Sequence, residues 1–199
     1  MDHIDQKAQA PRTEAEIREY TIGELKPLSG RISIVDYDSR WPELFEREAQ
    51  RIRSVLGTAA LRIEHAGSTS VPGLAAKPVI DLVLAVADSA DEDAYASALI
   101  GAGYILRIRE PGWYEHRVFK GPDTDINLHV FSHGCPEIDR MLLFRDWLRG
   151  SAADRDLYER TKRDLAQKEW TYVQNYADAK MDVINEIIAR AHMTATPHP

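Results

Sequence analysis

The chain has 199 residues, of which 44% are hydrophobic and 29% charged, and its formal net charge is −7 at pH 7. This composition is that of a globular protein and excludes wholesale disorder, while the negative charge disfavours a dedicated binder of duplex nucleic acid, which normally carries a basic surface. The single cysteine excludes an internal disulfide and a cysteine-based zinc cluster.

The first 29 residues are polar and are interrupted by two prolines, so we expect a loosely ordered arm with a short helix at 14–20. This polar start differs from a secretory signal, and no apolar run in the sequence reaches the roughly 18 residues of a membrane span. We therefore expect a cytoplasmic protein without a membrane partner. The sequence does not indicate its oligomeric state.

Ile32 and Ile34 alternate with polar residues, which predicts a short strand. Apolar residues at helical spacing predict a helix from Trp41 to Leu56, and Gly57 is expected to end it. A nearly continuous apolar run at 79–86 is typical of a central strand that is buried on both faces. The other predicted elements are strands at 61–65, 104–108, 114–120 and 125–131, and helices at 88–100, 136–149, 153–168 and 173–191. This order indicates an α/β or α+β protein with a mixed sheet and a C-terminal helical layer.

The segment between the strands at 61–65 and 79–86 carries the clearest chemical signal. Gly67 allows a ligand to approach the backbone closely, and the hydroxyl and amide groups of Ser68, Thr69 and Ser70 suit phosphate oxygens. Asp81 is the one acid in the apolar run that follows, where a carboxylate costs several kcal/mol to desolvate unless it is paired or binds a metal. We interpret Asp81 as a ligand of Mg²⁺ that bridges nucleotide phosphates, with a buried structural acid as the alternative.

A second polar group is predicted on the strand at 125–131. Side chains alternate along a strand, so Asp125, Asn127 and His129 share one face, while Ile126 and its apolar neighbours share the other. His129 fits a ligand role and a hydrogen-bonded structural role equally well. Basic side chains of the helix at 153–168 are interleaved with acids and are expected on a solvated face: Arg155, Lys162, Arg163 and Lys168.

Residues 65–81, from His65-Ala66-Gly67-Ser68 to Val79-Ile80-Asp81, resemble the signature of the GrpB family within the nucleotidyltransferase-fold superfamily. The resemblance extends over about residues 31–191 and includes four further matches: Tyr37 to Trp41, His116 to Lys120, Asn127 to Val130, and Tyr176-x-x-x-Lys180. It implies a nucleotidyltransferase-like mixed sheet with flanking helices in a domain at 30–192, followed by a flexible tail at 193–199.

The chain departs from the superfamily pattern at one position. Such enzymes follow the Gly-Ser turn with an acid-x-acid pair, but Val83 occupies the second position here. Because two metal ions usually need several carboxylates, we expect a reduced site that binds one metal or none, with Asp81 and Asp125 as the metal ligands. Asn127 resembles the position of the superfamily's third acid, so the expected catalytic residues are Asp81, Asn127 and His129.

The resemblance implies an enzyme that binds a nucleoside triphosphate with Mg²⁺ and transfers a nucleotidyl group to a small-molecule acceptor. The residues expected to bind phosphate are Gly67, Ser68, Thr69, Ser70, Lys77, Arg117 and Lys180. For Arg117 the alternative is a surface ion pair with Glu115, and for Lys180 a purely structural role. Two other functions stay open: a non-catalytic module that binds a nucleotide or phospho-ligand, and an ATP-dependent ligase of a biosynthetic pathway.

Overall fold

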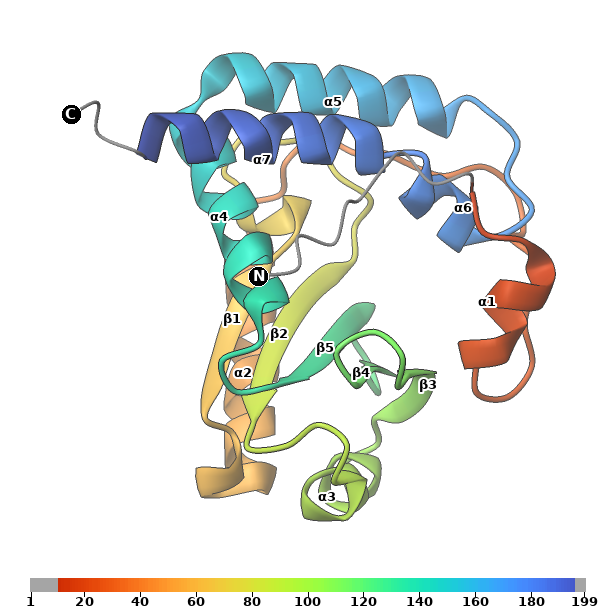
Figure 1. Cartoon of the computed structure of the whole chain (residues 1–199), viewed down its shortest axis with the longest axis vertical. Helices are drawn as coiled ribbons and strands as arrows, with labels where there is room; N and C mark the ends of the chain where they lie inside the picture. Colours follow the sequence, from red (N-terminus) through yellow and green to blue (C-terminus); the bar gives the residue numbers. More distant parts are fainter. Residues whose placement is uncertain (1–10, 196–199) are drawn as a thin grey trace.

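A five-stranded mixed sheet lies at the centre of the protein, which a computed structural model describes for residues 11–195 (Figure 1). The strands are β1 (Arg62–Ala66), β2 (Ile80–Val86), β3 (Ile105–Glu110), β4 (His116–Lys120) and β5 (Ile126–Ser132), in the order β1-β2-β5-β4-β3. The pairing of β2 with β5 is parallel, and the other three pairings are antiparallel. The expected α/β fold with a mixed sheet is confirmed.

Seven α-helices surround the sheet in the described part of the chain. They are α1 (Glu14–Tyr20), α2 (Trp41–Leu56), α3 (Ala96–Gly101), α4 (Pro136–Gly150), α5 (Ala152–Ala166), α6 (Val173–Asp178) and α7 (Met181–Ala195). Figure 1 shows α5 and α7 side by side above the sheet, with α4 descending from them along one of its faces. These three helices form the predicted C-terminal layer.

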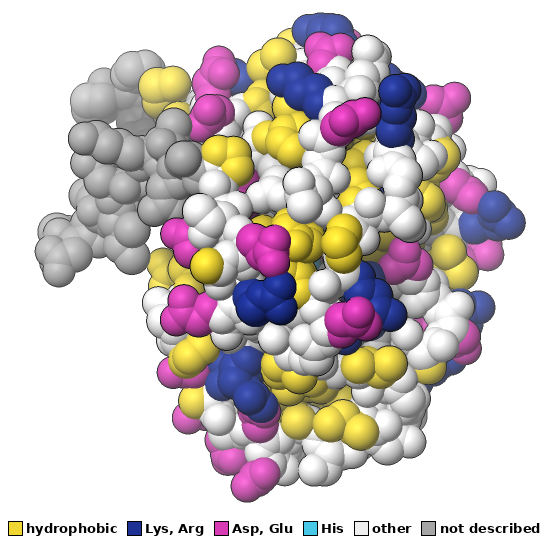
Figure 2. Space-filling view, turned by 90° about the vertical axis from the view of Figure 1, so that its right-hand side faces the viewer, with side chains coloured by type: hydrophobic (Ala, Val, Ile, Leu, Met, Phe, Trp, Pro, Cys, Tyr) yellow, Lys and Arg dark blue, Asp and Glu magenta, His cyan; other side chains and the backbone are white. Residues whose placement is uncertain are grey.

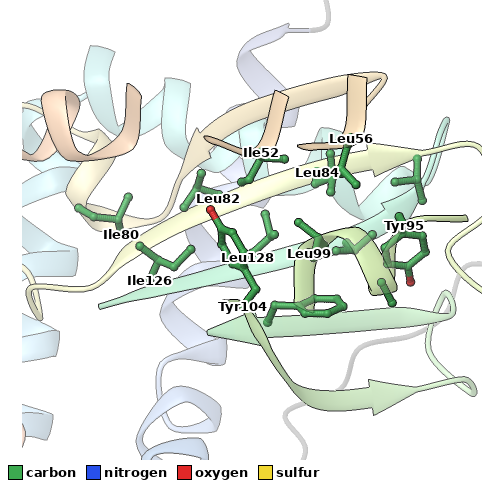
Figure 3. Packing of buried hydrophobic residues seen from close by; sticks show 14 of the residues in the cluster. Ile52, Leu56, Ile80, Leu82, Leu84, Tyr95, Leu99, Tyr104, Ile126 and Leu128 are labelled. Atoms are coloured by element: carbon green, nitrogen blue, oxygen red, sulfur yellow. The ribbon is translucent and has the colours of Figure 1, made fainter. Parts of the chain in front are cut away.

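The main hydrophobic core lies between the sheet and the helices α2 and α3 (Figure 3). Leu82 and Leu84 of β2 and Leu128 of β5 point into this core and are completely buried. Ile52 of α2 and Leu99 of α3 cover them. A smaller cluster on the opposite face packs α4 against the sheet: Ala66, Val83, Ala85, Phe131, Cys135, Ile138 and Leu142. Since both faces are covered, β2 is apolar along nearly its whole length.

Three predicted elements differ from the structure. The helix expected at 173–191 is two helices, because the hydrogen bonding tightens at Lys180, whose N–H donates to the Ala177 carbonyl at 3.2 Å. The helix expected at 88–100 is reduced to a 3₁₀ turn and the short α3. The strand expected around Ile32 and Ile34 is reduced to a single bridge between Val35 and Ala76 within the described residues.

The predicted arm at 1–29 is described from residue 11 onward. Arg12 forms an ion pair with Asp178 of α6 at 2.7 Å, and Ile17 of α1 is buried. Residues 1–10, and 196–199 of the predicted tail, lie outside the described residues, and α7 continues to Ala195. Between residues 11 and 195 no helix has the length and hydropathy needed to cross a bilayer. Figure 2 shows basic and acidic side chains intermingled on one face of the molecule.

Glu48 of α2 is a buried carboxylate that ties three elements together. Its oxygens accept hydrogen bonds from the Tyr104 hydroxyl at 2.8 Å and the Thr124 hydroxyl at 3.0 Å, and Arg51 lies 3.4 Å away. We predict that Glu48→Ala lowers the free energy of unfolding by about 2–4 kcal/mol, because it leaves the buried Tyr104 hydroxyl without an acceptor and Arg51 without this partner. Urea unfolding monitored by circular dichroism measures this change. Glu46→Ala, at an exposed position of the same helix, serves as the control and should change stability by less than about 0.5 kcal/mol.

Candidate functional site

Asp81 and Asn127 lie side by side at the start of the parallel pair β2–β5. The register makes them direct partners, and the Asn127 side-chain amide donates a hydrogen bond to Asp81 Oδ1 at 2.8 Å. His129 follows on the same face, with its Nε2 3.7 Å from that oxygen. The intervening Ile126, Leu128 and Val130 are completely buried in the core on the other side. The predicted facing of this strand is therefore confirmed.

The turn after β1 lies directly against Asp81. Gly67 has φ +65°, and a Cβ at this position would lie 2.3 Å from Asp81 Oδ2. Only glycine provides both the left-handed conformation and the space for the carboxylate. The turn at Gly67 and Ser68 and the carboxylate of Asp81 are thus in direct contact in the structure.

The three hydroxyl side chains of this turn differ in their availability. Thr69 is buried, with its hydroxyl 3.3 Å from the Val79 carbonyl and 3.1 Å from His65 Nε2. The Ser70 hydroxyl donates to the Gly67 carbonyl at 2.6 Å. Both hydroxyls therefore stabilise the turn itself. Ser68 is half-buried and interacts with Tyr158 of α5, so it is the hydroxyl of this group that lies beside the helical layer.

Lys77 and Lys180 interact electrostatically with Asp81. Burial lowers the pKa of Lys77, with Lys120 and Lys180 adding repulsion and Asp125 and Asp81 opposing it. Burial also lowers the pKa of Lys162 to about 7, helped by Lys180. The Lys180 ammonium lies 4.6 Å from the centre of the Tyr176 ring. Burial is the main cause of both pKa shifts, and repulsion by Lys180 adds to each of them.

The Asp81 carboxyl stays ionised in this environment. Burial by itself would raise its pKa, but the interaction with His129, the amide of Asn127 and the charge of Lys180 together lower it. Since 27% of its side chain is exposed, the carboxylate is accessible to a ligand. A partly exposed carboxylate near lysines is suited to a metal ion that arrives with a polyanion.

Asp125, the second expected metal ligand, forms an ion pair with a lysine of β4. Its Oδ1 accepts from the Lys120 ammonium at 2.7 Å, and the same ammonium donates to Asn127 Oδ1 at 3.0 Å. Within residues 11–195 no three His, Cys, Asp or Glu side chains are close enough to hold a metal ion. One carboxylate together with phosphate oxygens and water fits a single Mg²⁺. It does not fit a two-metal centre, which needs several carboxylates.

Arg117 is not brought to this group. Its neighbour Val118 pairs with His129, so alternation along β4 directs Arg117 to the opposite face of the sheet. There Arg117 is almost fully buried and forms ion pairs with Glu92 at 2.6 Å and Glu115 at 3.2 Å. This result corrects the expectation that Arg117 lies among the phosphate-binding residues. The alternative ion pair with Glu115 is present, but its arginine is buried and does not lie at the surface.

Two residues at the site were missed from the sequence. Lys162 is 2% exposed, and its ammonium donates to the Ala75 carbonyl and lies 4.8 Å from the Tyr158 ring. It was expected on a solvated face, and the structure corrects this. Tyr158, Lys162 and Leu165 fall on one side of α5 and are all buried. Their helical spacing could have indicated that Lys162 lies on the buried side of the helix. Lys120 lies at the site because it pairs with Asn127 across β4 and β5, and the sequence by itself gives no signal for this pairing.

Comparisons with known proteins agree with this structure. The family described as GrpB protein matches residues 31–190. A UPF0157 protein of Halalkalibacterium halodurans is 63% identical over 190 residues, which cover 96% of this chain and 97% of that protein. The crystal structure of the conserved protein GrpB from Enterococcus faecalis has a TM-score of 0.72 at 33% identity and covers 81% of this chain and 98% of that one. A dephospho-CoA kinase of Mycobacterium bovis is 31% identical over 173 residues, which are 74% of this chain and 42% of that protein.

We predict that Gly67→Ala is more destabilising than Gly73→Ala. Both glycines have positive φ, but a Cβ at Gly73 would meet nothing within 4 Å, whereas one at Gly67 would collide with Asp81. The collision should add about 1–3 kcal/mol to the backbone strain that both variants share. Chemical denaturation of the two variants measures the difference. Equal destabilisation would show that the turn and Asp81 are not in contact.

The pKa of Lys162 predicts a rise in stability with pH. In the folded protein it is about 7, below the ordinary value of 10.5, so above neutral pH the unfolded chain binds more protons at this position. Folding is therefore favoured increasingly as pH rises from about 7 to about 9, by at most about 1.4 kcal/mol per pH unit. Urea unfolding across this range should show a smaller slope for Lys162→Met. The exposed Lys168→Met is the control and should retain the slope of the parent.

Proposed function

Since this chain belongs to the GrpB family, we propose that it binds a nucleoside triphosphate with Mg²⁺ at the Asp81 group and transfers the nucleotidyl group to a small-molecule acceptor. One observation carries the proposal: an ionised carboxylate lies against a glycine turn and interacts electrostatically with Lys77 and Lys180. A triphosphate with its metal ion would bring charges that pair with both the carboxylate and the lysines.

Each of these residues has a distinct part in the proposed reaction. Asp81 would hold Mg²⁺ against the phosphates, and the metal would offset charge that develops on them. Gly67 provides the space in which the Asp81 carboxylate lies against the turn, so the metal and the phosphates would bind beside this turn. Lys77 and Lys180 bind phosphate oxygens and stabilise the departing pyrophosphate. Catalysis then consists mainly of positioning and of electrostatic stabilisation of the leaving group.

A non-catalytic nucleotide-binding module is the second candidate, and Val83 favours it. This side chain occupies the expected place of a second acid and is 1% exposed, packed under α4 with Ala66 and Phe131. The apolar contact leaves no room for another metal-binding group at that point. Both candidates share the same nucleotide site and differ in turnover. Pyrophosphate release, tested with amines and hydroxylated metabolites as acceptors, separates them.

We predict that Asp81→Asn abolishes metal-dependent nucleotide binding. The isostere keeps the shape of the side chain and removes its charge, so Mg²⁺ loses its protein ligand while the fold remains as stable or becomes slightly more stable. Calorimetric titration of ATP with Mg²⁺ and with EDTA measures binding, and thermal unfolding measures stability. Asp36→Asn, whose side chain is 93% exposed, is the matched control and should bind like the parent.

Two results would contradict this assignment. Equal affinity of the parent for ATP with Mg²⁺ and with EDTA would mean that Asp81 binds no metal. A large fall in the melting temperature of Asp81→Asn would identify Asp81 as a structural acid.

A further inference from the structure

A row of four side chains crosses the sheet at the level of Asp81. Asp81 on β2 pairs with Asn127 on β5. Asn127 pairs with Lys120 on β4, which in turn pairs with Ile105 on β3. Residues directly opposite one another in neighbouring strands share a face of the sheet, so the four side chains lie on the same side. Neighbouring strands are about 4.7–4.9 Å apart, and the row therefore extends about 14 Å from Asp81 to Ile105.

This row is accessible along its length, in contrast to the row that follows it on the same face. Its three polar side chains are half-buried, and that of Ile105 is 57% exposed. Val83 and Val118, which both pair with His129 in the next row, are buried. A ligand on this face of the sheet can therefore follow the first row from Asp81 to β3.

Ile105 gives the row an exposed apolar end. Of the large hydrophobic side chains within the five strands of the described chain, that of Ile105 alone is exposed. The next residue, Leu106, packs against the main core on the opposite face, so alternation along β3 directs Ile105 to the face of Asp81. The row thus combines polar groups beside Asp81 with an apolar contact at its far end.

The proposed phosphate site and this row lie on opposite sides of Asp81. β1 and β5 pair with the two edges of β2, so the Gly67 turn that follows β1 and the side chain of Asn127 flank Asp81 from either side. In the proposed function the phosphates bind beside the turn. In phosphoryl and nucleotidyl transfer the attacking atom and the leaving group lie roughly in line, on opposite sides of the phosphorus. The acceptor should therefore approach from the side of Asn127.

We infer that the acceptor lies along this row, with its reacting hydroxyl or amine beside Asp81 and an apolar group on Ile105. This inference rests on the proposed nucleotidyl transfer and adds the chemical class of its acceptor. The Lys120 ammonium in the middle of the row is already bound to Asp125 at 2.7 Å and to Asn127 at 3.0 Å, so it requires no anionic group of the ligand. The acceptor is accordingly polar at its reacting end and apolar at the other.

Two primary amines that differ only in chain length, ethylamine and hexylamine, test the apolar contact without any nucleotide. Hexylamine should bind at least about tenfold more tightly, because its additional methylene groups lose contact with water against Ile105. Titration of protein labelled with carbon-13 at the isoleucine methyl groups measures both affinities. The methyl signals of Ile105 should shift with hexylamine.

Variants of two exposed isoleucines show where the longer amine binds. Ile105→Ser should reduce the ratio of the two affinities to less than about threefold, whereas Ile105→Leu should retain it. Ile100→Ser is the matched control, because Ile100 is 55% exposed but belongs to α3, which packs on the opposite face of the sheet. Both serine variants should unfold like the parent, since neither side chain is buried.

Equal affinities of the parent for the two amines would overturn the inference, as would an affinity ratio that Ile105→Ser leaves unchanged or that Ile100→Ser lowers equally. A failure of the proposed function is recognised separately, by calorimetric titration with ATP and Mg²⁺. A parent that does not bind the nucleotide would contradict the transfer and, with it, the acceptor role of the row. A parent that binds ATP but does not distinguish the two amines would overturn this inference alone.

Discussion

The parallel pairing of β2 with β5 is the constraint on which the rest of the site depends. Its register sets Asp81 beside Asn127 and Val83 beside His129, and it places every intervening apolar residue in the core under α2 and α3. A shift of one residue would exchange the two faces and bury the polar groups. The hydrophobic effect therefore fixes the position of the carboxylate, since the core is stable only in the register that presents Asp81 to the other side.

The lysines near Asp81 are held in an unfavourable environment. Lys77 and Lys162 are held in an environment that disfavours their charged form, and Lys180 acts on both of them and on Asp81. A protein gains no stability from gathering amines in this way, because each adds repulsion and a desolvation cost. Clusters of perturbed groups are typical of functional sites. In the proposed function, a bound triphosphate would oppose both effects, because its negative charge favours the charged form of the lysines.

Much of the fold could be predicted from the sequence, because the signals involved are local. The apolar run of β2, the alternation along β5 and the Gly67 turn each depend on neighbouring residues. The errors have a common origin in tertiary contacts. Arg117 faces away from the site because of the register between two strands. The sequence around Lys162 is typical of a solvated helix face, and its burial follows only from the packing of α5 against the loop that contains Ala75.

Val83 shows how the packing of α4 limits the polar group around Asp81. It is the direct partner of His129 in the parallel register, and it lies one strand repeat beyond Asp81 on the same face of the sheet. Its side chain is 1% exposed and packs with Ala66 and Phe131 under α4. A carboxylate at this position would lose its hydration beneath the helix without a partner to compensate for it. The contact between α4 and the sheet therefore keeps this face of β2 apolar beyond Asp81, and the polar side chains remain where the strand begins.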